Sequence, residues 1–262
     1  MKGLKFNLIF LFVLLLAACA TVPLTGRKQL SLVDESQIQQ EATQAYKQFL
    51  GDPKTKVIKN SADAQRVKSI GNKIASAIDR YMRENGYGDQ YNYNWEFNLV
   101  ESKEINAWCM PGGKVAVYTG ILPVTATDAG LATVMGHEIA HAIAHHASER
   151  ASQMTAAQLG GGVVGVASGG SEIIGQLYGL GGQLALLKYS RNQESEADRL
   201  GLIFMAMAGY NPAKAIDFWQ RMASAKEGSG APPEFLSTHP SDETRIRNLQ
   251  KRLPEAQKYY KP

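Results

Sequence analysis

The stretch Met135-Gly-His-Glu-Ile-Ala-His-Ala-Ile-Ala-His-His146 decides both the fold and the chemistry that we expect of this chain. Within it, His137-Glu138-Ile139-Ala140-His141 has the pattern HExxH. Residues i and i+4 lie on one face of an α-helix, so the two imidazoles can bind one Zn²⁺. Glu138 then lies beside the open coordination position, where it can take a proton from metal-bound water. Because so short a pattern also arises by chance on ordinary amphipathic helices, it needs a third ligand in support.

Residues 128–158 are expected to form the helix that carries this motif. The run is rich in helix-forming residues, contains no proline and begins at Asp128, which fits an N-cap. On one continuous helix His145 would lie about 12 Å along the axis from His137, too far to share an ion. The pattern HExxHxxGxxH would need Gly at position 144 and His at position 147, and both are Ala. The third ligand must therefore come from elsewhere in the chain.

The best candidate lies in Ser190-Arg-Asn-Gln-Glu-Ser-Glu-Ala-Asp-Arg-Leu-Gly201, where Glu194 and Asp198 are again four residues apart. On a helix both can face the HExxH motif. Glu194 would bind the metal, while Asp198 would accept the free N–H of a ligating histidine and fix its tautomer. Glu196 is the alternative ligand, but it has no acidic partner four residues on, because position 200 is Leu.

The order His137-Glu138-x-x-His141 and then Glu194-x-x-Ala197-Asp198 resembles the HtpX-, BepA- and LoiP-type zinc metallopeptidases, a family that also holds the CaaX prenyl endopeptidases and the mitochondrial Oma-type proteases. Two further stretches fit this family, Asn106-Ala-Trp-Cys-Met-Pro-Gly-Gly-Lys-Val-Ala-Val-Tyr-Thr-Gly120 and Ser237-Thr-His-Pro240. The resemblance covers about residues 30–253. It implies an α+β, predominantly helical, zincin-like metallopeptidase domain with a small sheet or hairpin beside the zinc helix, and one Zn²⁺ per chain.

The stretch that begins at Asn106 predicts a β-hairpin, because Pro111-Gly112-Gly113 is a turn signal between two short strand-like pieces. An exposed hairpin edge beside the zinc cleft could add an extended peptide as another strand. The resemblance implies this substrate-binding role for Asn106 and Ala107. A purely structural hairpin remains the alternative.

His239 follows a loop rich in Gly, Pro and Ser, residues 226–233, and matches a position of the family. It would either hydrogen-bond the tetrahedral oxyanion or occupy the fourth zinc position in a resting state. Arg245 would hold this loop through a carboxylate in the site. The competing interpretation is that His239 is structural, as lone histidines often are.

The N-terminus has the features of a secretory signal. Lys2 and Lys5 precede the apolar residues 8–18, a run shorter than the ~20 residues that span a bilayer. Cys19 after Leu-Ala-Ala resembles a bacterial lipoprotein signal, so it is expected to become the lipidated mature N-terminus; an ordinary signal peptide with an incidental cysteine is the alternative. Ala20 rather than Asp at the next position predicts an outer-membrane location facing the periplasm.

We expect residues 1–18 to be removed, residues 19–33 to be a lipidated tether, residues 34–255 to form the metallopeptidase domain and residues 256–262 to be a tail. The Gly-rich residues 159–182 are expected to form a mobile helical hairpin that faces the membrane or controls access to the cleft. The alternative is close helix packing allowed by the small residues. Residues 87–95 are expected to form an exposed aromatic loop. The remaining elements predicted from periodicity and turn signals are helices over residues 35–50, 61–85, 183–208, 213–225 and 241–253 and a strand over residues 96–100.

Charge and cysteine content exclude other classes of function. Removing Lys2 and Lys5 leaves 26 basic against 24 acidic residues, a net charge of +2. Nucleic-acid binding would need a stripe of basic residues, and the sequence contains none. With Cys19 acylated, Cys109 is the one remaining thiol, so no intramolecular disulfide can form. We interpret Cys109 as a small buried residue and not as a nucleophile.

These observations predict a membrane-anchored zinc endopeptidase that hydrolyses misfolded or stalled cell-envelope proteins with metal-activated water. Its expected partners are unfolded peptide substrates, the membrane through Cys19, and an outer-membrane assembly machinery or a partner protease. One alternative is a chaperone-like assembly factor with latent protease activity. A structural zinc lipoprotein is the other, although a structural site is usually filled by four protein ligands and needs no Glu138.

Overall fold

The computed structural model describes residues 19–88, 90–160, 190–227, 235–236, 239 and 243–261. The predicted leader and residues 161–182 of the Gly-rich segment lie outside the described residues. Both interpretations of that segment therefore stay open.

A four-stranded sheet of order β3-β4-β6-β5 forms the centre of the fold. Strands β4 and β6 are parallel and the other neighbours are antiparallel, with Ala107 opposite Val117. The predicted strand and hairpin are confirmed, and Gly112 and Gly113 supply the positive φ angles of 77° and 81° that the turn requires. The strands are β3 (Val57–Ile58), β4 (Glu96–Val100), β5 (Ala107–Met110) and β6 (Lys114–Tyr118).

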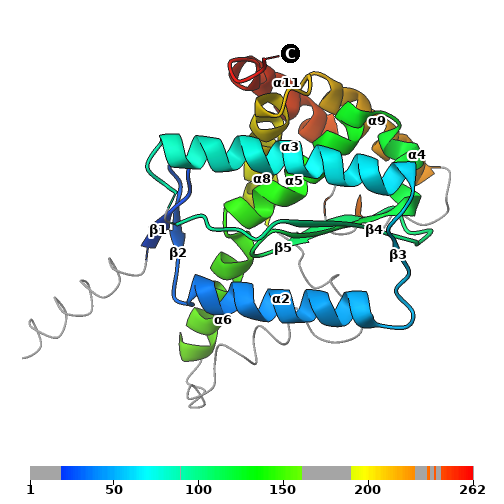
Figure 1. The fold of residues 1–262 in the computed structure, drawn as a ribbon. Helices are drawn as coiled ribbons and strands as arrows, with labels where there is room; N and C mark the ends of the chain where they lie inside the picture. The colour runs from blue at the N-terminus through cyan, green and yellow to red at the C-terminus, as the bar shows by residue number, and fades with distance from the viewer. Residues whose placement is uncertain are drawn as a thin grey trace, which may run out of the picture.

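Helices cover both faces of this sheet (Figure 1). Side chains alternate along each strand, so Leu99 and Val117 face the larger core while Trp108 and Ala116 face the smaller one. Helix α2 (Glu35–Gly51) lies over the smaller core, and α3 (Ala62–Glu84) and α5 (Asp128–Ile143) lie over the larger one. Helices α8 (Arg191–Met207) and α9 (Lys214–Glu227) pack on α5, and α11 (Glu243–Gln257) packs on α8 and α9. The predicted α+β, mainly helical fold is confirmed.

Helix α5 is the central helix, buried on all sides between the sheet and α8. Gly136 and Gly201 let the backbones of α5 and α8 touch: a Cβ added to Gly201 would lie 3.0 Å from the backbone nitrogen of His137. The two helices that carry the predicted metal ligands are thus held at backbone contact.

The predicted single helix over residues 128–158 is wrong, because the chain forms two helices, α5 and α6 (His146–Gly160). His145 lies between them with a φ of 51°, and its Nδ1 lies 2.8 Å from Glu35 Oε2. A left-handed residue cannot continue an α-helix, so the chain changes direction there. The N-cap of α5 is Thr127, whose hydroxyl accepts from Gly130 N, and Asp128 lies in the first turn.

Residues 19–33 are not the simple tether that we expected. Strand β1 (Cys19–Thr21) pairs with β2 (Lys28–Leu30) in an antiparallel hairpin beside the main sheet (Figure 1). Val22, in the turn of this hairpin, is 1% exposed within the larger core. Burial of this side chain docks the N-terminal segment on the domain.

Two further expectations differ from the structure. The aromatic residues before β4 are not an exposed loop: Tyr91 and Tyr93 are buried, and the hydroxyl of Tyr93 donates to Ala142 O. The last helix, α11, continues through Pro254 to Gln257 instead of ending at Leu253. Within the described residues no helix is both long and apolar enough to cross a membrane.

Candidate metal centre

Helix α5 brings the HExxH residues into one buried site. His137 and His141 lie one turn apart with their ring centroids 4.8 Å apart and their Nε2 atoms at 3.2 Å. Glu138 lies beside them and, like both histidines, is no more than 3% exposed. The spacing of the motif thus produces the convergence that it predicts.

Helix α8 adds Glu194 from its first turn. Ser190 caps this helix in a capping box with Gln193, which fixes where the helix begins. The carboxylate of Glu194 has Oε1 3.3 Å from His141 Nε2 and Oε2 3.5 Å from His137 Nε2. Glu194 therefore faces both histidines across the contact between α5 and α8.

His239 completes the cluster from the segment before α11. Its Nδ1 lies 2.9 Å from Glu194 Oε1 and 3.1 Å from His137 Nε2. One ligand atom from each of His137, His141, Glu194 and His239 can be chosen such that all lie within 4.8 Å of one another. Three imidazoles and one carboxylate therefore converge on one point.

The electrostatics of the cluster fit a divalent ion. Glu194 Oε2 is buried and accepts no hydrogen bond from the described residues. Burial opposes ionisation, but His239, His137 and His141 hold the pKa of Glu194 well below its usual value. Burial lowers the pKa of His141 well below that of a free imidazole, which keeps its ring neutral. Neutral imidazoles and an anionic carboxylate are the donors that zinc accepts in catalytic sites.

Glu138 lies against this cluster without being part of it. Burial raises its pKa to about 7, although the nearby His239 opposes the shift. Its Oε1 is buried, has no hydrogen bond from the described residues and lies 3.5 Å from His239 Nε2. A bound divalent cation would favour the ionised carboxylate.

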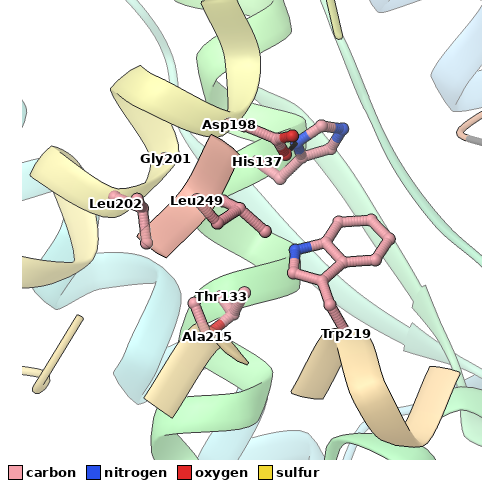
Figure 2. A pocket seen from close by; sticks show the side chains of 8 residues that line it. All are labelled: Thr133, His137, Asp198, Gly201, Leu202, Ala215, Trp219 and Leu249. Atoms are coloured by element: carbon pink, nitrogen blue, oxygen red, sulfur yellow. Dashed lines mark ion pairs between the residues drawn. The ribbon is translucent and has the colours of Figure 1, made fainter. Parts of the chain in front are cut away.

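Asp198 contacts the far side of the His137 ring, its Oδ1 lying 3.1 Å from Nδ1. Arg245 donates to both oxygens of Asp198, at 2.7 and 2.8 Å, and also to the carbonyl oxygen of His239. The guanidinium carbon lies 3.5 Å from the ring centroid of Trp219. Figure 2 shows Asp198 beside His137, with Trp219 at the edge of a small pocket lined by Thr133, His137, Asp198, Gly201, Leu202, Ala215, Trp219 and Leu249.

The model of peptidase family M48 matches residues 61–253. The chain belongs to this family of metallopeptidases. The match includes α5, α8 and His239, so all four cluster residues lie within the M48 region.

Similar proteins come from eukaryotes and bacteria. The chain is 32% identical over 242 residues to the mitochondrial metalloendopeptidase OMA1 of Schizosaccharomyces pombe, covering 90% of this chain and 67% of that protein. It is 39% identical over 172 residues to OMA1 of Saccharomyces cerevisiae, covering 63% and 49% of the two proteins. Identity to a putative beta-barrel assembly-enhancing protease of Vibrio cholerae is 31% over 170 residues, covering 60% of this chain and 34% of that protein.

These relatives contradict the predicted bacterial outer-membrane location. The fungal, plant and animal relatives are mitochondrial proteins at 29–39% identity. Our prediction rested on the resemblance of residues 1–19 to a bacterial lipoprotein leader and on Ala20 following Cys19. A short leader pattern and one residue beside it carry little information about location. Several relatives are also much longer, since the chain spans 49% of the budding-yeast protein and 34% of the bovine one.

The structure places the other predicted residues outside the cluster. Ala107 opens β5, which pairs with β6 at one end of the sheet order and contacts α5, while Asn106 precedes it. All four residues of β5 are buried, so the exposed edge that we expected at this hairpin is wrong. Cys109 faces the larger core, and burial raises its pKa well above the usual value, so its thiol is protonated. Cys19 is exposed at the start of β1.

Sequence reasoning missed His146, the buried residue that begins α6. Its Nδ1 lies 2.8 Å from His141 Nδ1, and its Nε2 lies 3.0 Å from Glu196 Oε2. Glu196, which we weighed as a rival ligand, therefore contacts His146 and is not in the cluster. The signal was present as a histidine five residues after His141, but a continuous helix would have carried it away from the site.

Proposed function

We propose that this M48 metallopeptidase is a zinc-dependent endopeptidase. The observation that supports this proposal is the position of Glu138 beside a buried cluster of His137, His141, Glu194 and His239. Glu138 lies on the same helix as the two histidines of HExxH. His137, His141 and Glu194 would hold the ion, which leaves the fourth position for water. When bound, Zn²⁺ supplies Lewis-acid polarisation of the scissile carbonyl and lowers the pKa of water.

Glu138 would act as the general base and then as the general acid. A carboxylate is an efficient general base when the pKa of the carboxylate lies close to the operating pH. Burial gives Glu138 this property, and its Oε1 lies 3.5 Å from His239 Nε2, on the side of the cluster where His239 lies. The proton that Oε1 takes from the attacking water is the one that it would return to the leaving amine.

His239 would serve the reaction in one of two ways. In the first, it donates a hydrogen bond to the developing oxyanion, for which a protonated Nε2 near Glu138 is suitably placed. In the second, His239 occupies the fourth ligand position of a resting enzyme. The 2.9 Å contact between His239 Nδ1 and Glu194 Oε1 favours this role. The second role supports a latent peptidase that mainly binds unfolded proteins, our alternative function.

The substrates that we propose are unfolded or stalled polypeptides in extended conformation. Strand β5 is the end strand in the order of the described sheet and contacts the helix that carries Glu138. A peptide added there as a further strand would bind mainly through its backbone, next to Asn106 and Ala107. Peptides of many sequences would therefore be accepted. The name of the Vibrio cholerae relative, a beta-barrel assembly-enhancing protease, is in keeping with such substrates. Membrane attachment through Cys19 stays a prediction.

The first test compares the parent protein with Glu138→Gln, because glutamine keeps the shape of the side chain but cannot take a proton. We expect both proteins to bind one zinc ion, and cleavage of unfolded casein to fall by about 10²–10⁴-fold in the variant. Metal content by mass spectrometry and casein turnover are the two measurements. Zinc in both with equal turnover would refute the role of Glu138; zinc in both with no turnover in either would favour the latent, binding function.

A further inference from the structure

The buried His146 links the metal cluster to the N-terminal hairpin. It is 0% exposed, and its ring centroid lies 4.9 Å from that of His141. The left-handed backbone of His145 separates α5 from α6, and the ring of the next residue, His146, lies against His141. The helix break thus brings His146 behind a predicted metal ligand.

Proton positions in this chain of contacts are determined by the metal site. His141 Nε2 faces Glu194 at 3.3 Å, so ligation through Nε2 leaves the proton of the neutral ring on Nδ1. That proton can be donated to His146 Nδ1 at 2.8 Å. His146 then carries its own proton on Nε2 and donates it to Glu196 Oε2 at 3.0 Å. One tautomer of each histidine satisfies both of these hydrogen bonds.

The carboxylate at the end of this chain is held by the N-terminal hairpin. Thr25 Oγ1 donates to Glu196 Oε1 at 2.5 Å, and Arg27 Nε donates to Oε2 at 2.6 Å. The other nitrogens of the Arg27 guanidinium bind Glu149 of α6 at 2.7 and 2.9 Å. Arg27 therefore joins α6, which begins with His146, to α8, which carries Glu196.

The same arrangement exists on the other ligand histidine. His137 contacts Asp198 directly, and Arg245 binds that carboxylate. His141 contacts Glu196 through the ring of His146, and Arg27 binds the carboxylate of Glu196. Carboxylates behind ligating histidines fix ring orientation and tautomer, and losing them lowers metal affinity. The two arginines enter from the N-terminal hairpin and from α11, at opposite ends of the domain sequence.

We propose that the N-terminal hairpin positions the metal ligand His141, through Arg27, Glu196 and His146. Arg27, Glu196 and His146 are positioning residues that never touch the ion or the substrate. The proposal rests on the proposed metal site, and it makes the hairpin part of the metal centre.

Arg27→Ala tests the proposal, with Arg199→Ala as the matched control. Arg199 also binds a carboxylate with two nitrogens, Glu255 at 2.7 and 2.9 Å, and its side chain is 28% exposed against 30% for Arg27. The measurements are the zinc Kd, by competition with a chelator, and the unfolding midpoint of the metal-free protein in urea. We expect Arg27→Ala to raise the Kd about tenfold and Glu196→Gln to raise it by about 10–100-fold, the range seen for outer partners of ligands. Arg199→Ala should leave the Kd within about twofold of the parent value, because the hydrogen bonds of Arg199 in the described part of the chain go to Glu255 and to none of the metal ligands.

The outcomes separate this proposal from the proposed function. A parent protein that binds zinc and cleaves casein while Arg27→Ala and Arg199→Ala have the same Kd overturns the positioning role alone. A Kd change in Arg27→Ala that disappears once both variants are compared at equal fraction folded also overturns it. A parent protein that binds no zinc overturns the proposed function and this inference together.

Discussion

Asp198 contacts both the His137 ring and Arg245, so a single substitution there should change the metal site without removing a ligand. Although burial opposes ionisation, Arg245 and His137 hold the pKa of Asp198 below its usual value, so it is an anion at neutral pH. In Asp198→Asn the side chain keeps its volume but presents one acceptor oxygen and loses its charge. The tautomer of His137 would then be less firmly fixed.

We expect Asp198→Asn to weaken zinc binding by about 10–100-fold. Chelator competition measures this change, and Asp217→Asn serves as the control, because Asp217 forms an exposed pair with Lys214 on α9. Parent-like affinity in Asp198→Asn would contradict the orienting role that we assign to this carboxylate.

At the scale of elements, the contact between α5 and α8 depends on two glycines. A Cβ on Gly201 would lie 3.0 and 3.1 Å from backbone atoms of His137, and backbone atoms of a buried helix cannot rotate away. Gly201→Ala gains up to about 1 kcal/mol of helix propensity. Overpacking costs about 1–3 kcal/mol, so the steric term should prevail.

Gly201→Ala is therefore expected to lower the free energy of unfolding by about 1–2 kcal/mol. Zinc affinity should fall as well, because α8 carries Glu194 away from the histidines of α5. Gly51→Ala is the control, since no atom lies within 4 Å of a Cβ at that position of α2. Urea unfolding of the metal-free proteins decides the matter: equal midpoints for the two variants would contradict the close-contact argument.

The sequence was sufficient for the elements whose signals are local. The spacings of His137 with His141 and of Glu194 with Asp198 each placed two side chains on one helical face, and Pro111-Gly112-Gly113 marked the hairpin. The break at His145 was missed because neither Gly nor Pro occurs there, and the αL conformation is accompanied by a distant contact with Glu35. The docked hairpin was missed for a similar reason, since its strands have three residues each and Arg27 binds partners far along the chain.

At the scale of the whole molecule, the ion would join segments that are distant in sequence. The cluster draws on α5, on α8 and on His239 before α11. A ligand that binds only the folded state stabilises it by about 2.7 kcal/mol when its free concentration is 100 times its Kd. For a domain of this size each kcal/mol shifts Tm by roughly 2–4 °C.

Removing the metal should therefore lower Tm by roughly 5–11 °C relative to protein saturated at 100 times the Kd. Differential scanning fluorimetry with zinc, and after dialysis against a chelator, measures the shift. His141→Ala is the control, because it lacks a ligand and should show little change between the two conditions. A metal-independent Tm in the parent would show that the cluster does not bind the ion in the folded state.

The order of the cluster residues along the chain has a consequence for biosynthesis. His137, Glu138 and His141 leave the ribosome well before Glu194, and His239 follows only in the last part of the chain. A nascent or truncated chain that ends before these residues has two imidazoles and a base but cannot assemble the four-residue cluster. We therefore expect a chain that ends before Glu194 to bind zinc more weakly than the full chain, because it lacks the carboxylate ligand.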